Sequence, residues 1–144
     1  MKKNKETFFV FVYIIIMENT YINTPFNYTG SKFKLLPQIL PLFDYRKSMF
    51  VDLFTGGGSV YTNIVDKFDK VLINDIIPEL IEIHKQILKP NFIEKVKQIV
   101  PPKDDQEMFL QLRKSFNEEK TPEKLYALML SSTNNMIRFN KKYD

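Results

Sequence analysis

Cysteine is absent from this 144-residue sequence, and histidine occurs only once, at His84. Without cysteine, neither a disulfide framework nor a thiolate metal site can form. The absence fits a reducing compartment. A single histidine excludes a histidine metal cluster. We therefore expect no metal in this protein.

A strong charge of one sign is also lacking, because the formal net charge is only +4. Such a mild excess permits nucleic-acid binding without demanding it. Hydrophobic residues make up 44% of the chain and aromatic residues 14%, which is ample for a packed core and argues against disorder. The length suits one domain or part of one.

No hydrophobic run is long enough for a membrane helix. The run from Phe8 to Met17 follows Lys2, Lys3 and Lys5, which superficially mimics a signal peptide. No small-residue cleavage site follows it, and it has about half of the ~20 residues that a membrane helix needs. We expect residues 1–23 to be an N-terminal extension, either an extra strand or a stretch upstream of a true start at Met17.

Glycine is scarce, and three of the four glycines are consecutive, at positions 56–58. An apolar run over 49–53 precedes them, and apolar residues at helical spacing follow as far as about Lys67. This pattern predicts a strand over about 49–54, a tight turn and a helix, whose first backbone amides can meet a ligand. The motif matches neither a phosphate loop nor a strict dinucleotide fingerprint. A plain tight turn is the alternative.

An acid in the next strand indicates which ligand the turn holds. A strand over 70–74 ends at Asp75, about twenty residues after the first glycine, where a carboxylate can accept hydrogen bonds from both ribose hydroxyls. The combination indicates a cofactor that carries a nucleoside. Asp52 ends the first strand and is expected to face the charged end of the cofactor. Two carboxylates suit a cationic ligand better than a pyrophosphate.

Beyond Pro78 the sequence turns helical, with apolar residues on one face of each segment. Pro101 and Pro102 end one helix, and Asp104 with Glu107 is expected to cap the next. His84 lies on an apolar helix face, so we expect a packed or partly buried histidine rather than a catalytic one. The fold class is thus α/β in the first half and mainly α in the second.

Three motifs follow one another along the chain: Tyr28-Thr29-Gly30-Ser31-Lys32, Asp52-Leu53-Phe54-Thr55-Gly56-Gly57-Gly58-Ser59 and Asn74-Asp75. Together they resemble the Dam-type (D12 class) DNA adenine methyltransferases. The resemblance runs from about Thr24 to the C-terminus, with the motifs in the order and spacing of that family. It implies an incomplete Rossmann-like methyltransferase sheet (24–78) followed by a helical DNA-recognition region (79–144). It also implies methyl transfer from S-adenosylmethionine to the exocyclic amine of adenine in duplex DNA.

The resemblance also assigns roles to residues. It implies that Lys32 reaches the methionine carboxylate of the cofactor and that Tyr28 packs near its apolar stem, while Asp75 keeps the ribose role. Tyr28 and Phe54 as plain core aromatics, and Lys32 as a solvated lysine, are the alternatives. The full set of expected cofactor contacts is Tyr28, Lys32, Asp52, Phe54, Gly56, Gly58 and Asp75.

The last residues resemble the Arg-aromatic-Asn stretch that ends the DNA-recognition region of the family. Arginine and asparagine suit bidentate contacts with guanine and adenine edges. We therefore expect Arg138 and Asn140 to touch bases and Lys141 and Lys142 to meet phosphates. A solvated, basic end of the chain is the alternative.

The catalytic motif of the family, Asp-Pro-Pro-Tyr, does not occur in these 144 residues. In the family it holds the adenine that has been flipped out of the duplex. The prolines of Val100-Pro101-Pro102-Lys103 lack the polar residue before them and the aromatic residue after them. We therefore expect an N-terminal portion of an enzyme of restriction-modification type, inactive by itself.

Three further expectations concern the partners, the location and the competing functions. We expect the partners to be duplex DNA and a complementary C-terminal fragment. We expect no membrane association and a cytoplasmic location. The first competing function is a non-catalytic DNA- or cofactor-binding remnant or one half of a split methyltransferase. The second is another Rossmann-like methyltransferase that acts on RNA or a small molecule.

Overall fold

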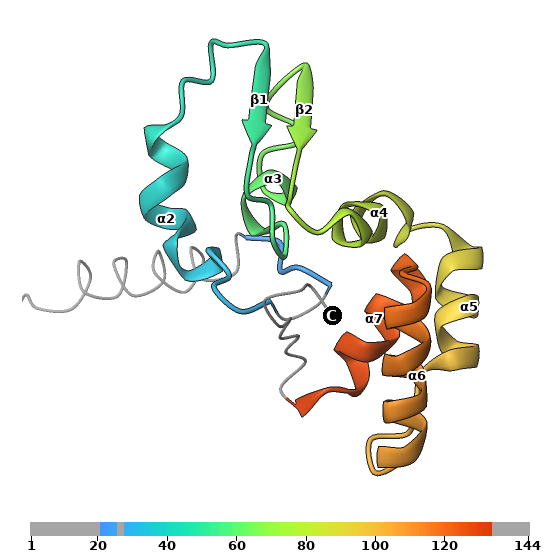
Figure 1. Cartoon of the computed structure of the whole chain (residues 1–144). Helices are drawn as coiled ribbons and strands as arrows, with labels where there is room; N and C mark the ends of the chain where they lie inside the picture. The colour runs from blue at the N-terminus through green and yellow to red at the C-terminus, as the bar shows by residue number, and fades with distance from the viewer. Residues whose placement is uncertain (1–20, 26–27, 134–144) are drawn as a thin grey trace, which may run out of the picture.

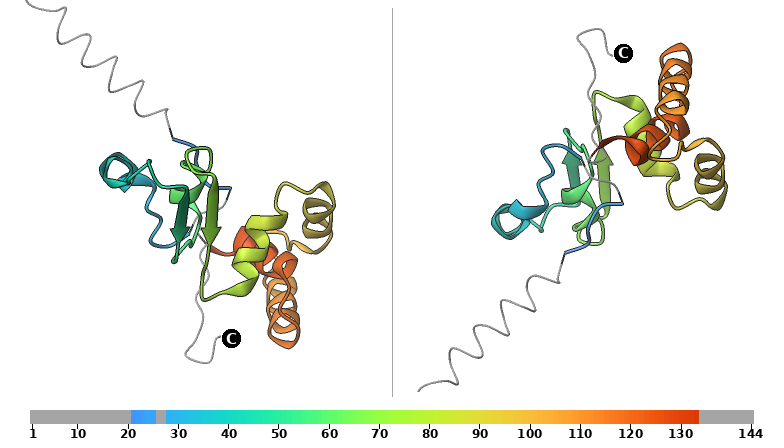
Figure 2. Two further views of the ribbon diagram at one scale, coloured as in Figure 1. Left: turned by 90° about the horizontal axis from the view of Figure 1, so that it is seen from above. Right: turned by 90° about the horizontal axis from the view of Figure 1, so that it is seen from below.

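The computed structural model describes residues 21–25 and 28–133, which form a mixed α/β structure (Figure 1). Two strands lie in the first half and the longer helices in the second, as the sequence predicts. Figure 2 shows α2 and the helices α4–α7 on opposite sides of the two strands. In chain order the elements are the 3-10 turn η1 (Phe33–Leu35), α2 (Leu36–Ile39), the 3-10 turn η2 (Leu40–Leu42), β1 (Met49–Asp52), α3 (Ser59–Thr62), β2 (Lys70–Ile73), α4 (Pro78–Gln86), α5 (Pro90–Ile99), α6 (Gln106–Glu118) and α7 (Pro122–Ser131).

The strands β1 and β2 form a two-stranded parallel sheet in the described part of the chain. Met49 is paired with Lys70, and Asp52 with Ile73. The hydrogen bonding continues one step past the strands, because Asn74 N–H donates to the Asp52 carbonyl at 2.8 Å. Both strands therefore end at the same edge of the sheet. In Figure 1 their arrowheads point toward α3 and the beginning of α4.

The helix α3 ends at Thr62, so the prediction of a helix as far as about Lys67 is wrong. The reason lies in Asn63, whose side-chain amide donates to the Ser59 carbonyl at 2.8 Å and to the Ile22 carbonyl at 2.9 Å. The Ser59 carbonyl is the group that the Asn63 backbone N–H would use in a continuing α-helix. Asparagine competes with helical hydrogen bonds in this way, and the chain continues in turns.

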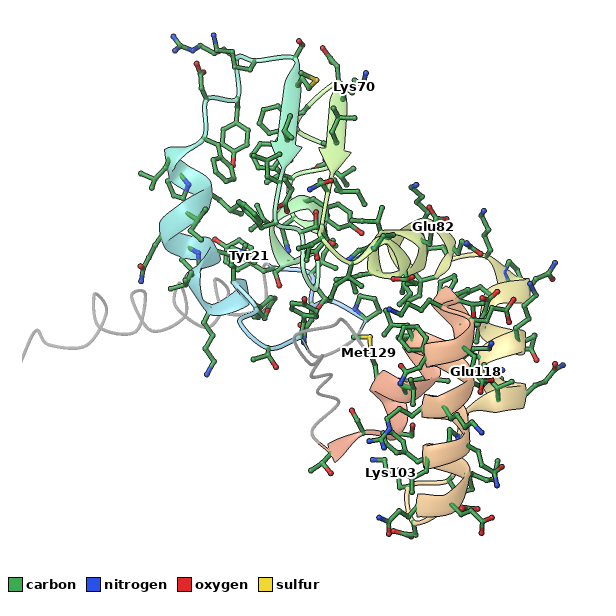
Figure 3. The ribbon with its side chains drawn as sticks, in the orientation of Figure 1. Tyr21, Lys70, Glu82, Lys103, Glu118 and Met129 are labelled. Atoms are coloured by element: carbon green, nitrogen blue, oxygen red, sulfur yellow. The ribbon has the colours of Figure 1, made fainter. Side chains whose placement is uncertain are left out.

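The helices of the second half pack around α7, which contacts α4, α5 and α6. Residues 125–129 of α7 are all buried, as expected of a helix surrounded by others. Met129, labelled in Figure 3, is only 2% exposed. A proline occupies the first turn of α4, α5 and α7, where its missing N–H costs no hydrogen bond.

The cap of α6 is one residue later than predicted. Asp105, not Asp104, precedes the helix, and its Oδ1 accepts a hydrogen bond from the backbone N–H of Met108 at 2.9 Å. Because the helix begins at Gln106, only the carboxylate of Asp105 stands at the N-cap position, from which a side chain reaches the amide three residues on.

Two hydrophobic clusters make up the interior. The larger lies among α4–α7, and the smaller consists of Leu36, Leu40, Val60 and Ile64. Phe50 of β1, Phe68 and Tyr21 pack against the smaller cluster, and Figure 3 shows Tyr21 beside the first helical turns.

The other face of the sheet is exposed. Met49 and Val51 of β1 are 48% and 42% exposed, and Leu72 of β2 is 43% exposed. Side chains alternate between the two faces of a strand, which places these three residues on one face, opposite Phe50. We refer to Met49, Val51 and Leu72 as the open sheet face.

Residues 21–25 connect the two halves. The backbone N–H of Ile22 donates to Oδ1 of Asn63 at 2.7 Å, next to α3. The hydroxyl of Tyr126 in α7 donates to the carbonyl of Pro25 at 3.3 Å. This short segment therefore contacts the sheet half at one end and the helical half at the other.

Candidate functional site

The glycine turn connects β1 to α3 and has the conformation that glycine permits. Gly56 and Gly58 have φ angles of +49° and +84°, in the left-handed region that other residues rarely adopt. Gly58 is the N-cap of α3, and its N–H donates to the Thr55 carbonyl at 2.8 Å. The turn lies at the carboxyl ends of the parallel strands, where α/β proteins bind ligands.

The turn is also enclosed by neighbouring side chains. A Cβ added to Gly57 would lie 2.8 Å from Cβ of Tyr28. One added to Gly58 would lie 2.5 Å from Cε1 of Tyr61 and 2.8 Å from Cε1 of His84. Glycine is therefore required here by close packing as well as by backbone conformation.

Asp75 joins the end of β2 to the turn. Its Oδ2 accepts a hydrogen bond from the backbone N–H of Gly56 at 2.9 Å, and its Oδ1 accepts one from Ile77 N–H at 3.2 Å. Asp75 and the glycine turn are therefore in direct contact, while the predicted ribose role of Asp75 stays a prediction. Carboxylates hydrogen-bonded in this way are held in a fixed orientation.

The segment 28–32 lies against the turn from the other side. The ring of Tyr28 packs on Gly56 and Gly57, and its pKa is raised by burial and, to a lesser extent, by the negative charge of Asp75. The hydroxyls of Ser31 and Ser59 lie 2.8 Å apart and share a hydrogen bond. Lys32 Nζ donates to the Phe54 carbonyl at 3.4 Å.

These parts enclose a cavity of about 380 Å³, within the size range of small-molecule sites. Of the seven predicted cofactor contacts, five lie in its wall: Tyr28, Lys32, Phe54, Gly56 and Asp75. The other wall residues, which sequence patterns did not single out as contacts, are Thr29, Gly30, Ser31, Thr55, Gly57, Ser59, Val60 and Ile76.

Ile76 is notable among these additional wall residues. It is 87% exposed, and Phe54 in the same wall is 77% exposed. Large apolar side chains this exposed at a cavity are available to a planar or apolar ligand. No sequence pattern singles out Ile76, and its position directly after Asp75 is the one feature that could have indicated it.

Asp52 and Gly58 are the two predicted contacts outside the cavity wall. Oδ2 of Asp52 is buried and has no hydrogen-bond partner among the described residues. Burial raises the pKa of Asp52, while the charge of Lys32 and the backbone amides of Phe54 and Tyr61 act in the opposite direction. The role of Asp52 toward a ligand stays a prediction.

His84 is partly buried, as predicted, and it has partners that its position in the sequence did not indicate. Its Nε2 lies 2.8 Å from the Gly56 carbonyl, and its Nδ1 lies 3.0 Å from the Tyr61 hydroxyl. Burial is the largest cause of its lowered pKa. The histidine therefore touches the glycine turn from inside the protein.

The remaining predicted features lie elsewhere or outside the described residues. Arg138, Asn140, Lys141 and Lys142, the predicted DNA contacts, lie beyond residue 133 and thus outside the described residues. Pro101 and Pro102 connect α5 to α6 and are not among the residues that line the cavity.

Two findings concern metals and membranes within residues 21–25 and 28–133. Over these ranges, no group of three or more histidine, cysteine or acidic residues is placed to hold a metal ion. In the same part of the chain, no helix has the length and apolar character needed to cross a bilayer.

Comparison with known proteins identifies the family to which the chain belongs. A sequence profile of the D12 class N6 adenine-specific DNA methyltransferases matches residues 28–144. The match covers the segment 28–32, the glycine turn and Asp75 in one stretch. The chain belongs to this family, which confirms the resemblance seen in the sequence.

Individual relatives agree with the family assignment. The chain is 36% identical over 131 residues to modification methylase StsI of Streptococcus sanguinis, a match covering 86% of the chain and 20% of the relative. It is 35% identical over 133 residues to the type II methyltransferase M.FokI of Planomicrobium okeanokoites, covering 88% and 20%. For the DNA adenine methylase of Haemophilus influenzae the values are 29% over 124 residues, 80% and 42%. The chain thus spans between a fifth and two fifths of the length of these relatives.

Proposed function

We propose that this chain is the cofactor-binding part of an S-adenosylmethionine-dependent methyltransferase that modifies adenine in duplex DNA. The observation that carries the proposal is the meeting of three segments at one cavity. The segment 28–32, the glycine turn and Asp75 come from separate parts of the chain and line the same 380 Å³ space. Family membership over residues 28–144 supports the reaction class.

The residues present fit the proposed cofactor group by group. Asp75 supplies a carboxylate that accepts hydrogen bonds from ribose hydroxyls. Lys32 supplies a positive charge for the carboxylate of a methionine moiety. Phe54 and Ile76 supply exposed apolar surface for a nucleobase. Because its side chain is exposed at the cavity, Ile76 is also a proposed contact of the cofactor.

The electrostatics of the site also suit this cofactor. S-adenosylmethionine carries its transferable methyl group on a positively charged sulfonium. Asp52 is the last residue of β1, and Asp75, two residues after the end of β2, accepts a hydrogen bond from Gly56 in the turn. We propose that they favour a cationic ligand near the turn, because opposite charges attract strongly where water is partly excluded.

Binding to the purified 144-residue chain tests the proposal. We expect isothermal titration with S-adenosylmethionine to give a measurable Kd, and Asp75→Ala to weaken binding by about tenfold or more, the effect of losing ~1.4 kcal/mol of charge-assisted hydrogen bonding. Asp66→Ala is the matched control, because Asp66 pairs with Lys67 on the exposed surface. Absence of binding by the folded wild-type chain would overturn the proposal.

Catalysis by the isolated chain is not part of the proposal. The sequence contains no Asp-Pro-Pro-Tyr motif, so we expect no transfer of labelled methyl groups to DNA by these residues alone. We propose that the base-binding groups come from further polypeptide, either in the same reading frame or as a separate complementary fragment. Labelled DNA after incubation with the chain alone would contradict this part.

A cofactor- or DNA-binding remnant, or one half of a split enzyme, is the second candidate. The open sheet face favours it, since a parallel sheet is normally covered on both faces. An Asp-Pro-Pro-Tyr segment in the adjacent downstream frame supports a split enzyme, and its absence supports a remnant. Methyl transfer to RNA or a small molecule is disfavoured by the segment 28–32, whose place before the first strand is typical of the DNA enzymes.

The DNA contacts, the domain limits and the location belong to the same proposal. Arg138 and Asn140 are proposed to touch bases, and Lys141 and Lys142 to touch phosphates. The division into 1–23, 24–78 and 79–144 stays a prediction. A cytoplasmic location is proposed because the substrate would be cellular DNA.

A further inference from the structure

His84 belongs to α4 and lies outside the cavity wall, yet its imidazole touches the inner side of the glycine turn. Nε2 lies 2.8 Å from the carbonyl oxygen of Gly56, and Nδ1 lies 3.0 Å from the hydroxyl of Tyr61. The rings of Tyr61 and His84 meet edge to face, with centroids 5.3 Å apart and an interplanar angle of 89°. One side chain thus connects α4, α3 and the turn.

The chemistry of the three groups fixes the position of the proton on the ring. A carbonyl oxygen only accepts hydrogen bonds, so Nε2 must carry the proton and donate to Gly56. In a neutral imidazole Nδ1 is then an acceptor, and the Tyr61 hydroxyl donates to it. Every polar atom of the pair is satisfied by this single arrangement.

The charged groups near the ring do not make its doubly protonated form the dominant one. Asp52 at the end of β1 and Asp75 after β2 both favour the protonated ring, as does the Gly56 carbonyl, but burial outweighs them and lowers the pKa of His84. The neutral form therefore dominates near neutral pH, where the ordinary value of 6.5 is already exceeded.

The peptide groups of the turn are held from two sides. Gly56 donates its N–H to Asp75 and accepts at its carbonyl from His84. Gly58 has no room for a Cβ, because the rings of Tyr61 and His84 stand against it. Both glycines with left-handed φ angles are thus in contact with His84, and Gly56 is also bonded to Asp75.

We infer that His84 is a positioning residue whose neutral imidazole, protonated at Nε2 and accepting from Tyr61, holds the glycine turn in the shape that forms the cavity. The inference rests on the proposed cofactor function for its consequence, namely tighter cofactor binding. A preformed turn does not have to be ordered when the ligand binds, and affinity gains accordingly.

The tautomer itself is directly measurable, because His84 is the single histidine of the sequence. With ¹⁵N-labelled histidine in the full chain near neutral pH, we expect the Nε2 resonance of a protonated nitrogen and the Nδ1 resonance of an unprotonated one. In Tyr61→Phe we expect the tautomer preference to weaken. A wild-type ring protonated at Nδ1, or averaged between tautomers, would overturn the inference.

Three variants connect the tautomer to binding. His84→Leu removes the donor, and we expect its Kd for S-adenosylmethionine to rise by about tenfold. His84→Gln keeps a donor near the position of Nε2 and is expected to recover most of the affinity. The matched control is Lys85→Ala, which changes an exposed neighbour on the same helix whose ammonium group pairs with Glu82 at 2.7 Å.

A folded His84→Leu variant with wild-type affinity would overturn the inference. If this variant fails to fold, Tyr61→Phe takes its place, since it keeps the ring and removes only the hydroxyl. We expect its Kd to rise by about two- to tenfold, the value of one neutral hydrogen bond. Wild-type affinity in a folded Tyr61→Phe chain would also overturn the inference.

Failure of the proposed function gives a different result. If the folded wild-type chain binds no S-adenosylmethionine, the cofactor proposal fails, and the turn itself is judged by amide hydrogen exchange. We then expect the amides of residues 56–58 to exchange faster in His84→Leu and Tyr61→Phe than in the wild type and in Lys85→Ala. Equal exchange in all four proteins would overturn the positioning role.

Discussion

Single residues set the shape of the glycine turn, and Gly58 shows how. Its φ of +84° and its contacts with the rings of Tyr61 and His84 are two separate reasons for glycine. Gly30 offers a natural comparison, because it has a φ of +81° but nothing within 4 Å of an added Cβ. Comparing alanine substitutions at Gly58 and Gly30 therefore distinguishes the cost of the left-handed backbone from the cost of steric overlap.

We predict that Gly58→Ala destabilises the chain more than Gly30→Ala does. The left-handed backbone costs an alanine about 1 kcal/mol at either position, and only Gly58→Ala must also displace two packed rings. Urea unfolding followed by circular dichroism measures both variants. Equal losses of free energy would show that the rings yield to a methyl group and that packing against Gly58 is loose.

Asp52 allows a prediction of pH dependence. Burial raises its pKa above the ordinary value of 3.8. A carboxyl with a raised pKa in the folded state supports stability fully below its unfolded value and loses that support as the pH rises through the folded value. Near neutral pH the buried charge therefore opposes folding.

We accordingly predict that Asp52→Asn raises the free energy of unfolding near neutral pH and that the gain shrinks toward pH 3.8. The same variant is expected to weaken S-adenosylmethionine binding, because it removes one of the two carboxylates proposed to favour a cation. A variant that is less stable than the wild type near neutral pH would contradict the cost assigned to burial. Such trade-offs between stability and function are common at binding sites.

For single residues, the sequence predicts those that belong to a local motif, but it does not predict contacts between distant segments. Tyr28, Lys32, Phe54, Gly56 and Asp75 carry their signal in local patterns, and all five line the cavity. Ile76 was missed because an exposed apolar residue has no pattern of its own. The partners of His84 were missed because Gly56 and Tyr61 come from other elements, and periodicity describes only the helix on which a residue lies.

Among the helices and strands, α6 allows the clearest test of how much an N-cap residue stabilises a helix. Its N-cap is Asp105, and the neighbouring Asp104 is a matched control with the same charge. We predict that Asp105→Ala lowers the free energy of unfolding by about 1 kcal/mol, the usual value of an N-cap, and that Asp104→Ala changes it far less. Denaturant unfolding of the two variants decides, and equal effects would indicate that charge near the helix, not the cap, is responsible.

The elements also show why their limits are harder to predict than their existence. The strands β1 and β2 and the helices α4–α7 lie where apolar periodicity placed them. The helix α3 is shorter than apolar periodicity predicts, because the side chain of Asn63 binds the Ser59 carbonyl and the backbone of Ile22. Ile22 is distant in sequence, so no pattern within the helix could reveal this competition.

At the scale of the whole molecule, the open sheet face is the feature without a covering layer among the described residues. Met49, Val51 and Leu72 are each more than two fifths exposed. Apolar patches of this kind mark surfaces that associate with other polypeptide. The relatives are several times longer than this chain, so additional polypeptide is available in them to cover such a face.

We predict that the purified chain self-associates through this face. Replacing Val51 and Leu72 by threonine keeps β propensity and removes apolar contact area. The double variant is therefore expected to sediment at a smaller average mass at high concentration, with little change in thermal stability. An unchanged mass distribution would contradict association through the open sheet face.

The segment 21–25 has a thermodynamic consequence for the molecule. It is bonded to Asn63 beside α3 and to Tyr126 of α7, and it leads along the chain to Tyr28 in the cavity wall. The hydrogen bond from Tyr126 therefore joins α7 to the stretch of chain that leads into the cavity wall. Coupling between two sites is reciprocal, so a ligand of the helical half that changed the affinity of the cavity by some factor would have its own affinity changed by the same factor when the cavity is occupied.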